Sequence, residues 1–416
     1  MRQQGVLLST SRSGPDIQVP VKIKYASLYS GCGGLDLGFE RAGFQQHCSF
    51  DHDVNALETL QRNTGATVRL ADLSKPDADV IQKVSESDIL IAGPPCQGFS
   101  TAGKNDPTDE RNKHLLNVAE IACLAKPKLV LIENVKGLLS PTNKYHYEET
   151  VSKLESSDYK VTSKSYLVSD FGIAQSRTRV LITAVLDEKP LNLNLKHKSP
   201  KRLSDILRGS EDIINGQIYP LSEEGNDYKI SRRISQGQKL SNVRCGISSI
   251  HTWNIPEVFG QVNDTEISIL EIISRLRRQN RRRSNGDADP VEPYYIDKSY
   301  GSDTSEILNS LIKKGYAKRV EDYIDITHTF NGKYRRPHWN DVSPTVDTRF
   351  GQPRYFLHPD QHRGFTVREA ARIQSFPDSY KFFGSDQVNF RMIGNAVPPS
   401  FSIQIAEYIR DEWFKR

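Results

Sequence analysis

The sequence has few cysteines, and none of them are arranged as a disulfide framework or a zinc site. Five of the 416 residues are cysteine, an odd number, and no two form a Cys-x-x-Cys pair. Such usage is typical of a reducing compartment, where a cysteine serves either packing or chemistry. We therefore expect a cytoplasmic protein without a metal site.

Long apolar segments are absent as well. No apolar run approaches the ~20 residues that cross a bilayer, and residues 1–20 contain no apolar stretch of signal-peptide length. Hydrophobic residues make up 37% of the chain and charged residues 26%. This balance excludes membrane proteins, collagens and wholly disordered chains, and the length predicts two or three domains.

An excess of one charge is present only locally. Residues 275–283 read RLRRQNRRR, with six arginines and no acid, and without these six the net charge of +5 becomes −1. A local basic patch is typical of a surface that meets a polyanion, although a solvated helix face has the same composition. Nucleic acid is therefore one of the two interpretations that composition leaves open.

The first half of the chain alternates short β-rich runs with helical patterns. Apolar runs occur at residues 25–29, 88–92, 128–132 and 179–185, and helical patterns at 53–63, 111–125 and 146–156. Strands that alternate with helices of this length predict a mainly parallel, doubly wound α/β sheet. The runs DILIAG and KLVLIENV are apolar on both faces, as parallel strands covered by helices should be.

The character changes after about residue 191, where the chain becomes polar and basic. Residues 284–300 have the composition of an insertion or linker. Around them we expect two amphipathic helices and then two short strands, the outline of a winged helix at about residues 266–330. The expected elements are helices at 266–282 and 304–314 and strands at 316–320 and 323–329. An amphipathic segment at 402–414 should return to pack on the first domain.

A glycine-rich turn follows the first strand. The run SLYSGCGGLDLGF leads an apolar strand into Gly31, Gly33 and Gly34 and then into a helix. Glycines let a backbone turn sharply and approach a ligand closely, and Asp51 and Asp72 follow at the next strand ends. The turn lacks the GxGxxG spacing, and no GxxxxGK[ST] motif is present, so nicotinamide and nucleotide-triphosphate sites are disfavoured.

Two further motifs end apolar strands. Cys96 lies in GPPCQGFS, directly after the run at 88–92, and Glu133 closes the run KLVLIENV. Ligands bind at the carboxyl ends of strands in open α/β sheets, which favours a nucleophilic cysteine over a buried structural one. A carboxylate that ends an apolar strand is costly unless it is used or paired, so Cys96 and Glu133 form a candidate nucleophile and proton-handling pair.

In combination these motifs resemble the DNA (cytosine-5)-methyltransferase family. GPPCQGFS, ENV, QSRTR at 175–179 and GNAVPP at 394–399 occur in the family's order, behind SLYSGCGGLDLGF. The resemblance covers about residues 25–186 and 343–414. It implies a Rossmann-like S-adenosylmethionine-dependent catalytic domain, residues 22–190 plus 385–416, with a smaller target-recognition domain inserted at 191–384.

The resemblance also implies roles for individual residues. The cofactor S-adenosylmethionine would be bound by Tyr29, Gly31, Cys32, Gly33, Gly34, Asp51, His52, Asp72, Pro95 and Asn395. Cys96 would be the nucleophile, Glu133 would hydrogen-bond the cytosine ring near N3, and Arg179 would contact the base oxygen. Arg177 would help to hold the flipped nucleotide and, with Gln175, support the catalytic loop. Ser100 would contact phosphate, and the motif at 368–377 would be scaffold.

Candidate DNA-binding side chains outside those motifs are arginines of the middle region. Arg232, Arg233 and Arg244 could read bases or contact phosphates, and the basic tract would bind phosphates through Arg275, Arg277, Arg278, Arg281 and Arg282. His52 and His114 stand where family members usually carry an aromatic residue and a leucine, which affects cofactor affinity rather than bond making.

The resemblance implies a covalent mechanism on a flipped base. A thiolate at Cys96 would add to C6 of cytosine and make C5 nucleophilic, and the target atom is reachable only outside the stack. We expect a monomeric modification enzyme of a bacterial restriction-modification system, acting on duplex DNA. A cognate endonuclease would share its target site and need not bind it.

Two alternatives remain. The tRNA cytosine-5 branch of the family has a compact recognition region with a Cys-Phe-Thr tripeptide, which is absent here. A catalytically silent DNA-binding regulator would have no need to retain Cys96, Glu133 and Arg179 together.

Overall fold

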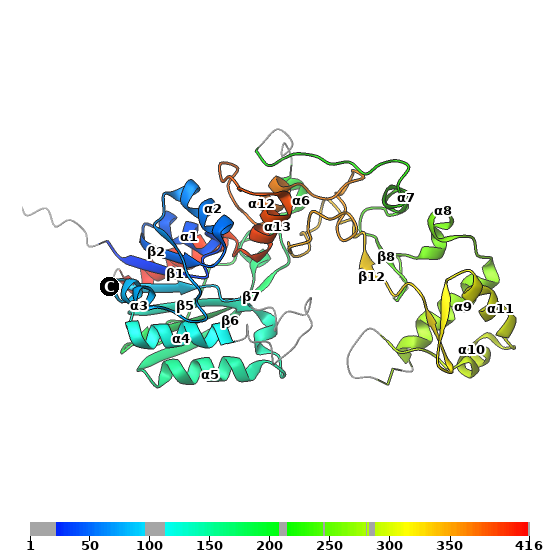
Figure 1. The fold of residues 1–416 in the computed structure, drawn as a ribbon, viewed down its shortest axis with the longest axis horizontal. Coiled ribbons are helices and arrows are strands. Elements are labelled where there is room, and N and C mark those ends of the chain that lie inside the picture. The colour runs from blue at the N-terminus through cyan, green and yellow to red at the C-terminus, as the bar shows by residue number, and fades with distance from the viewer. Residues whose placement is uncertain are drawn as a thin grey trace, which may run out of the picture.

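The computed structural model describes residues 22–95, 113–207, 214–243, 246–279, 281–282 and 288–414. Figure 1 shows two lobes, a sheet with its helices on the left and a smaller group of helices and strands on the right. Segments carrying α7, β8 and β12 run between them. Among the described residues, no helix is long and apolar enough to span a bilayer.

The first lobe is built on a seven-stranded sheet in the order β3-β2-β1-β4-β5-β7-β6. The strands are β1 Lys24–Leu28, β2 Gln45–Asp51, β3 Val68–Leu70, β4 Ile89–Ala92, β5 Leu129–Val135, β6 Tyr159–Leu167 and β7 Thr178–Leu186. Strands β1 to β5 pair in parallel, whereas β7 runs antiparallel to both β5 and β6. The predicted mainly parallel α/β fold is confirmed.

Helices cover both faces of this sheet. They are α1 Gly34–Arg41, α2 Val54–Thr64, α3 Ala78–Ser85, α4 Lys113–Ala125, α5 Lys144–Glu155 and, from the far end of the chain, α14 Pro399–Ile409. Alternate strand residues face opposite layers. Leu90 of β4 packs in one core with α3, α4 and α5, while Ile89 packs in the other with α1 and α14. The predicted return of the C-terminal helix to this lobe is confirmed.

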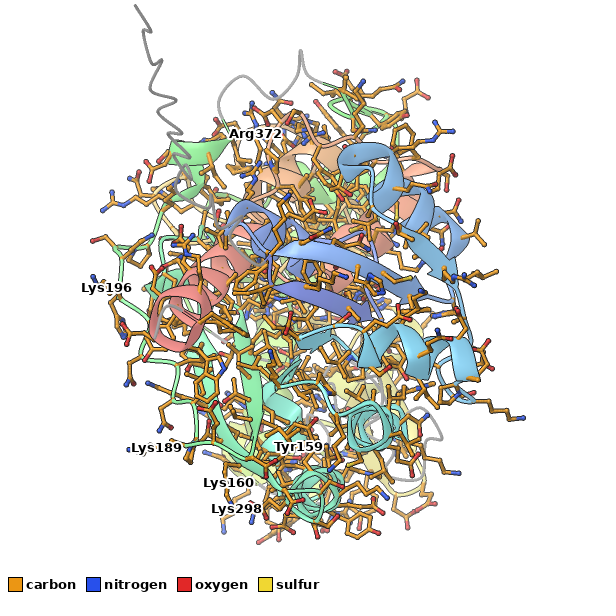
Figure 2. All side chains as sticks on the ribbon, turned by 90° about the vertical axis from the view of Figure 1, so that its left-hand side faces the viewer. Tyr159, Lys160, Lys189, Lys196, Lys298 and Arg372 are labelled. Atoms are coloured by element: carbon orange, nitrogen blue, oxygen red, sulfur yellow. The ribbon has the colours of Figure 1, made fainter. Side chains whose placement is uncertain are left out.

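The sheet ends at β6, an edge strand that carries lysines. Lys160 and Lys164 are exposed along it, and Figure 2 shows Lys160 projecting beside Lys189 at this margin. Charged side chains on an edge strand oppose pairing with another chain. These lysines therefore help to protect the edge from pairing.

A third core ties the C-terminal third of the chain to the first lobe. Phe350, Phe365 and Ile373 pack with Cys32 and Leu37 of the glycine turn and α1. The elements here are α6 Leu203–Ile206, α12 Val367–Ile373 and α13 Asp386–Asn395. Arg368 donates hydrogen bonds to the carbonyl oxygens of Ile214, Pro377 and Tyr380 at 2.6–3.1 Å, as expected for scaffold.

The second lobe contains the expected pair of helices and a hairpin, plus one helix that sequence reasoning missed. It comprises α9 Asp264–Gln279, α10 Pro293–Tyr300, α11 Ser305–Lys313, β10 Ala317–Val320 and β11 Tyr323–Ile326. Val291 pairs antiparallel with Ile324. The order of elements is a helix, a short strand, two helices and a hairpin, and the winged helix stays a prediction. Helix α10 lies in the stretch that was predicted to be a linker. A helix can form there because Pro293 is tolerated in a first turn and the Ile296 side chain is buried.

Between the lobes lies a small sheet in the order β12-β8-β9. Its strands are β8 Lys239–Ser241, β9 Ser249–Ile250 and β12 Asn331–Lys333, flanked by α7 Asn226–Arg232 and α8 Pro256–Phe259. Leu240, Tyr334 and Leu357 belong to its core. This sheet connects the second lobe to the segment that packs on the glycine turn.

Candidate active site

Three loops meet at the carboxyl ends of β1, β4 and β5. Gly93 follows β4, and a Cβ placed on it would lie 3.7 Å from the main-chain oxygen of Tyr29 and 3.9 Å from Oε2 of Glu133. Pro95 is the last described residue of this loop, and Cys96 and Ser100 lie outside the described residues. The topology therefore brings the chain that leads to Cys96 beside Glu133.

Glu133 and Arg179 form a buried ion pair at this edge. Nε of Arg179 is 2.5 Å from Oε1 of Glu133, and the residues are 8% and 7% exposed. Because Arg179 stands opposite Val135 in the antiparallel register, its side chain lies diagonal to Glu133 on the same face. The two facing atoms make no well-aligned hydrogen bond within the described residues. A buried carboxylate and a guanidinium side by side are suited to a polar ligand that can hydrogen-bond to both.

Asp51 is held as an anion at the end of β2. Its carboxylate accepts hydrogen bonds from the amides of Gly31 and Asp53 at 2.8 and 2.9 Å, and Nδ1 of His52 lies 3.3 Å away. Burial alone would raise the pKa of Asp51, but these contacts outweigh it, so the pKa is lowered. The His52 ring is 79% exposed beside it.

The glycine turn presents one open position and several packed ones. Gly31 has φ +53°, and no atom of the described residues lies within 4 Å of a Cβ placed there. A Cβ on Gly33 would be 2.5 Å from Leu60, and one on Gly34 would be 2.3 Å from the Val397 oxygen. Cys32 is buried, with Sγ 3.6 Å from the Met392 oxygen. Gly31 therefore borders free space, whereas Cys32, Gly33 and Gly34 face protein on their side-chain side.

The remaining predicted cofactor residues surround this turn. The Tyr29 hydroxyl is 3.2 Å from the Leu73 oxygen and 3.0 Å from Nδ1 of His114, which directs the phenol toward the loop after β3. Asp72 in that loop is exposed and accepts from the Ser74 amide, and Asn395 is exposed at the end of α13. Carboxylates and open main chain thus gather at one sheet edge.

Comparison with known proteins agrees with this geometry. The family model for C-5 cytosine-specific DNA methylases matches residues 23–411. The chain belongs to this family. It is 30% identical over 423 residues to the Type II methyltransferase M.NlaIV of Neisseria lactamica, covering 90% of this chain and 96% of that protein. It is 29% identical to M.DdeI of Desulfomicrobium norvegicum, over 93% of this chain and 88% of that protein.

Solved structures share the fold of the methylase. A prophage-encoded DNA modification methyltransferase (E. coli) aligns with a TM-score of 0.55 and 22% identity, over 95% of this chain and 100% of that one. The Dnmt2 methyltransferase of S. pombe aligns with a TM-score of 0.52 and 16% identity, over 94% and 100%. At these identities the likeness concerns architecture.

Two predicted site residues of the methylase are buried and hydrogen-bond to other segments of the chain. Arg177 is 3% exposed and donates to the carbonyl oxygens of Val346 and Gly394 at 3.0 and 3.1 Å. Gln175 is fully buried, bonds to the side chain of Gln374 and accepts from the Val346 amide at 2.9 Å. Both side chains therefore position the chain around Arg179, and the contact of Gln175 with DNA stays a prediction.

The predicted DNA-binding arginines divide by exposure. Arg232, Arg275, Arg278, Arg281 and Arg282 are exposed, and Arg233 is half-exposed and paired with Glu257. Arg277 is instead 4% exposed, with Nε 2.6 Å from Oδ1 of Asp325. It anchors α9 to β11 and is not part of a solvated basic face. Arg244 lies outside the described residues.

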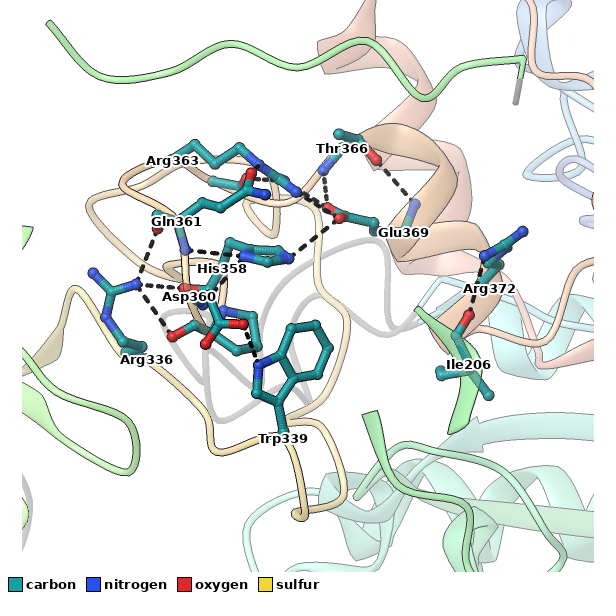
Figure 3. Close-up of polar contacts among 12 residues, drawn as sticks. Ile206, Arg336, Trp339, His358, Asp360, Gln361, Arg363, Thr366, Glu369 and Arg372 are labelled. Carbon is teal, nitrogen blue, oxygen red and sulfur yellow. Dashed lines mark hydrogen bonds and ion pairs between the residues drawn. The ribbon is translucent and has the colours of Figure 1, made fainter. Parts of the chain in front are cut away.

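A buried polar network that sequence reasoning missed orders the loop before α12 (Figure 3). The side chains of Arg363 and Glu369 are both buried, and they pair through two hydrogen bonds of 2.8 and 2.7 Å. Nε2 of His358 lies 3.5 Å from the same carboxylate, and Arg336 donates to the main-chain oxygen of His358 at 2.6 Å. The only sequence signal is the capping box at Thr366 and Glu369, which predicts a helix start and not an ion pair.

Proposed function

We propose that the chain transfers a methyl group from S-adenosylmethionine to C5 of a flipped-out cytosine in a specific duplex DNA sequence. The observation that carries this proposal is the buried Glu133–Arg179 pair beside Gly93, where β4 leads toward Cys96. It unites a carboxyl group, a guanidinium and a cysteine-bearing loop at one sheet edge. That combination suits an uncharged heterocycle with a ring nitrogen and a carbonyl.

The residues at the glycine turn fit S-adenosylmethionine. Asp51 is an anion beside the open main chain of Gly31, which suits a ribose diol, and the exposed His52 ring suits an adenine face. Asp72 would accept from the adenine amino group. The other predicted contacts, from Tyr29, Pro95, Asn395 and the main chain of residues 31–34, remain part of this proposal. When bound, the cofactor supplies an electrophilic methyl group.

Cys96 and Glu133 carry the chemistry on the base. The Cys96 thiolate adds to C6 while Glu133, protonated and released from its ion pair with Arg179 when the base is bound, delivers a proton to N3, so that C5 becomes electron-rich. The Arg179 guanidinium would donate to the base oxygen. Once C5 carries the methyl group, a base removes the C5 proton, the N3 proton is returned, and the Cys96–C6 bond breaks to release the thiolate. Flipping the base costs a few kcal/mol, which DNA contacts must offset.

The biological setting follows from the relatives. M.NlaIV and M.DdeI are named Type II methyltransferases, so we place this chain in a restriction-modification system, acting in the cytoplasm. Residues 22–190 and 385–416 form the proposed catalytic domain, and residues 191–384 carry target recognition. We propose a monomer, because a palindrome can be modified one strand at a time. A cognate endonuclease needs to share only the target site.

Transfer of label from radiolabelled S-adenosylmethionine tests the proposal. Mixed-sequence duplex DNA and total tRNA are offered separately to the wild type, Cys96→Ser and Glu133→Gln. We expect label in duplex DNA, none with Cys96→Ser, and a 10²- to 10⁴-fold slower rate with Glu133→Gln. Bisulfite sequencing then identifies the methylated cytosine. Label in tRNA alone, or label that survives Cys96→Ser, would refute the proposal.

A further inference from the structure

Two cations stack on one partly buried tyrosine between the lobes. Nζ of Lys333 lies 3.8 Å from the ring centroid of Tyr355, and Cζ of Arg349 lies 4.4 Å from it. Hydrogen bonding from Lys333, followed by the charges of Lys333 and Arg349, lowers the pKa of the Tyr355 hydroxyl. The ring and its hydroxyl thus hold two positive charges close together at a surface that remains accessible.

Further cations surround this pair. A Cβ on Gly332, which has φ +94°, would lie 3.2 Å from Nη2 of Arg335 and 3.3 Å from Cδ of Lys239. Asp347 is the carboxylate that pairs here, with Oδ2 2.6 Å from Nη2 of Arg349. Lys333 and Arg349 on the Tyr355 ring, together with the neighbouring Arg335, whose Cζ lies 6.0 Å from the centroid of the Phe356 ring, form what we call the Tyr355 cluster.

The neighbouring Arg354 shows what a neutralised arginine on this segment looks like. Its Nε is 3.3 Å from both carboxylate oxygens of Asp227, and Asp227 also accepts from the Tyr334 hydroxyl at 2.6 Å. Within the described part of the chain, the three cations of the Tyr355 cluster share one paired carboxylate, that of Asp347. Like charges held together repel each other, and an incoming anion relieves that repulsion.

The cluster stands on the segment that joins the active site to the second lobe. Lys333 ends β12, and the amides of Tyr334 and Arg335 donate to the oxygens of Arg354 and Tyr355. Arg349 follows the turn at Asp347, whose main-chain carbon would lie 2.6 Å from a Cβ on Gly394. Gly394 accepts from Arg177, two residues before Arg179. Short steps of chain thus connect the Tyr355 cluster to the Glu133–Arg179 pair.

We propose that the Tyr355 cluster binds backbone phosphates of the DNA duplex next to the flipped base. This inference rests on the proposed function and adds a contact surface to it. Arg335 and Arg349 provide forked donors and Lys333 a point charge, a combination that suits phosphate oxygens. Contacts to phosphate fix position and carry no sequence information. The Tyr355 ring holds the cations in place before DNA arrives.

The test measures binding of fluorescent duplexes by anisotropy at several salt concentrations. Wild type, Lys333→Gln, Arg349→Gln and the charge-preserving Lys333→Arg are compared on the methylated target sequence and on an unrelated duplex. Lys164→Gln is the matched control, because Lys164 also lies over a tyrosine, with Nζ 5.5 Å from the Tyr166 ring, but on the edge strand β6. Thermal unfolding checks that each variant is folded.

Loss of each phosphate contact should make the negative slope of log Kobs against log salt shallower by about 0.9. This corresponds to roughly fivefold weaker binding at 0.15 M salt. The loss should be equal on both duplexes, and Lys333→Arg and Lys164→Gln should bind like wild type. Unchanged affinity in Lys333→Gln and Arg349→Gln, or a loss of affinity confined to the target duplex, would overturn the inference. If the wild type still methylates duplex DNA, the proposed function stands in that case. A wild type that neither binds nor methylates duplex DNA would overturn both.

Discussion

Asp36 offers a test of how burial acts beneath the glycine turn. It lies in the first turn of α1 with no exposed surface, and its carboxylate accepts from Ser27 at 3.1 Å and from Ser49 at 2.6 Å. Desolvation outweighs both hydrogen bonds and raises the pKa of Asp36 to about 6. Asp36→Asn removes the charge and keeps a side chain of the same shape, which the two hydroxyls can still bond.

The magnitude follows from linkage between protonation and folding. The folded pKa of about 6 exceeds the ordinary value of 3.8, so between these pH values the folded state binds more protons than the unfolded state. Stability therefore falls as pH rises through this window, and above it the cost is about 3 kcal/mol, at 1.36 kcal/mol per pKa unit. Asp36→Asn should match wild type near pH 4 and be more stable by up to ~3 kcal/mol at pH 7.

Urea unfolding at pH 4, 5, 6 and 7 measures this difference. Glu40 is coupled to Asp36 and also titrates in this range, because burial and then the charge of Asp36 raise its pKa to about 7. Removing that charge should also ease the ionisation of Glu40, which adds to the gain at pH 7. The reasoning is refuted if the stability difference stays constant between pH 4 and 7, or if Asp36→Asn is less stable at pH 7.

Three further changes test other parts of the molecule. Glu369→Gln should cost about 3–5 kcal/mol in urea unfolding, because it leaves the buried Arg363 without its counter-charge. Glu148→Gln, at an exposed pair, should leave the free energy of unfolding nearly unchanged, and equal costs for the two substitutions would contradict this. Asp51→Asn should weaken S-adenosylmethionine binding about tenfold in calorimetry, and unchanged affinity would remove Asp51 from the cofactor site. Gly38→Ala should lower the unfolding midpoint, equivalent to about 1–3 kcal/mol, because the added Cβ would lie 2.1 Å from a side chain of α14; an unchanged midpoint would show that α1 and α14 can separate freely.

Periodicity and composition predicted much of the first lobe. The runs later seen as β1, β4, β5 and β7 are apolar and short, and the helical patterns between them match α2, α4 and α5. The antiparallel direction of β7 was not predictable from its sequence, because a strand buried on both faces has the same composition either way. Helix α10 was missed because the acidic, proline-containing sequence around it has loop composition, and its burial depends on α9.

The candidate site was predictable to the extent that a motif marks a strand end. Glu133 lies two residues before the end of β5, and Asp51 is the last residue of β2. Burial of polar side chains was not predictable, because it depends on partners far away in the chain. Arg277 reads as one more arginine of a basic tract until Asp325 is placed against it.

Those distant partners suggest why recognition and chemistry are difficult to separate in this fold. Gln175 and Arg177 come just before Arg179 in the chain. Their side chains hydrogen-bond to residues far away in the sequence, namely Val346, Gln374 and Gly394. The same C-terminal segment packs its apolar side chains on the glycine turn and continues into the Tyr355 cluster. A close-packed interior transmits strain. A shift of this segment on contact with DNA would therefore displace both the cofactor turn and the Glu133–Arg179 pair. DNA binding and assembly of the active site are therefore expected to be coupled through residues 343–395, rather than through the basic tract of the second lobe.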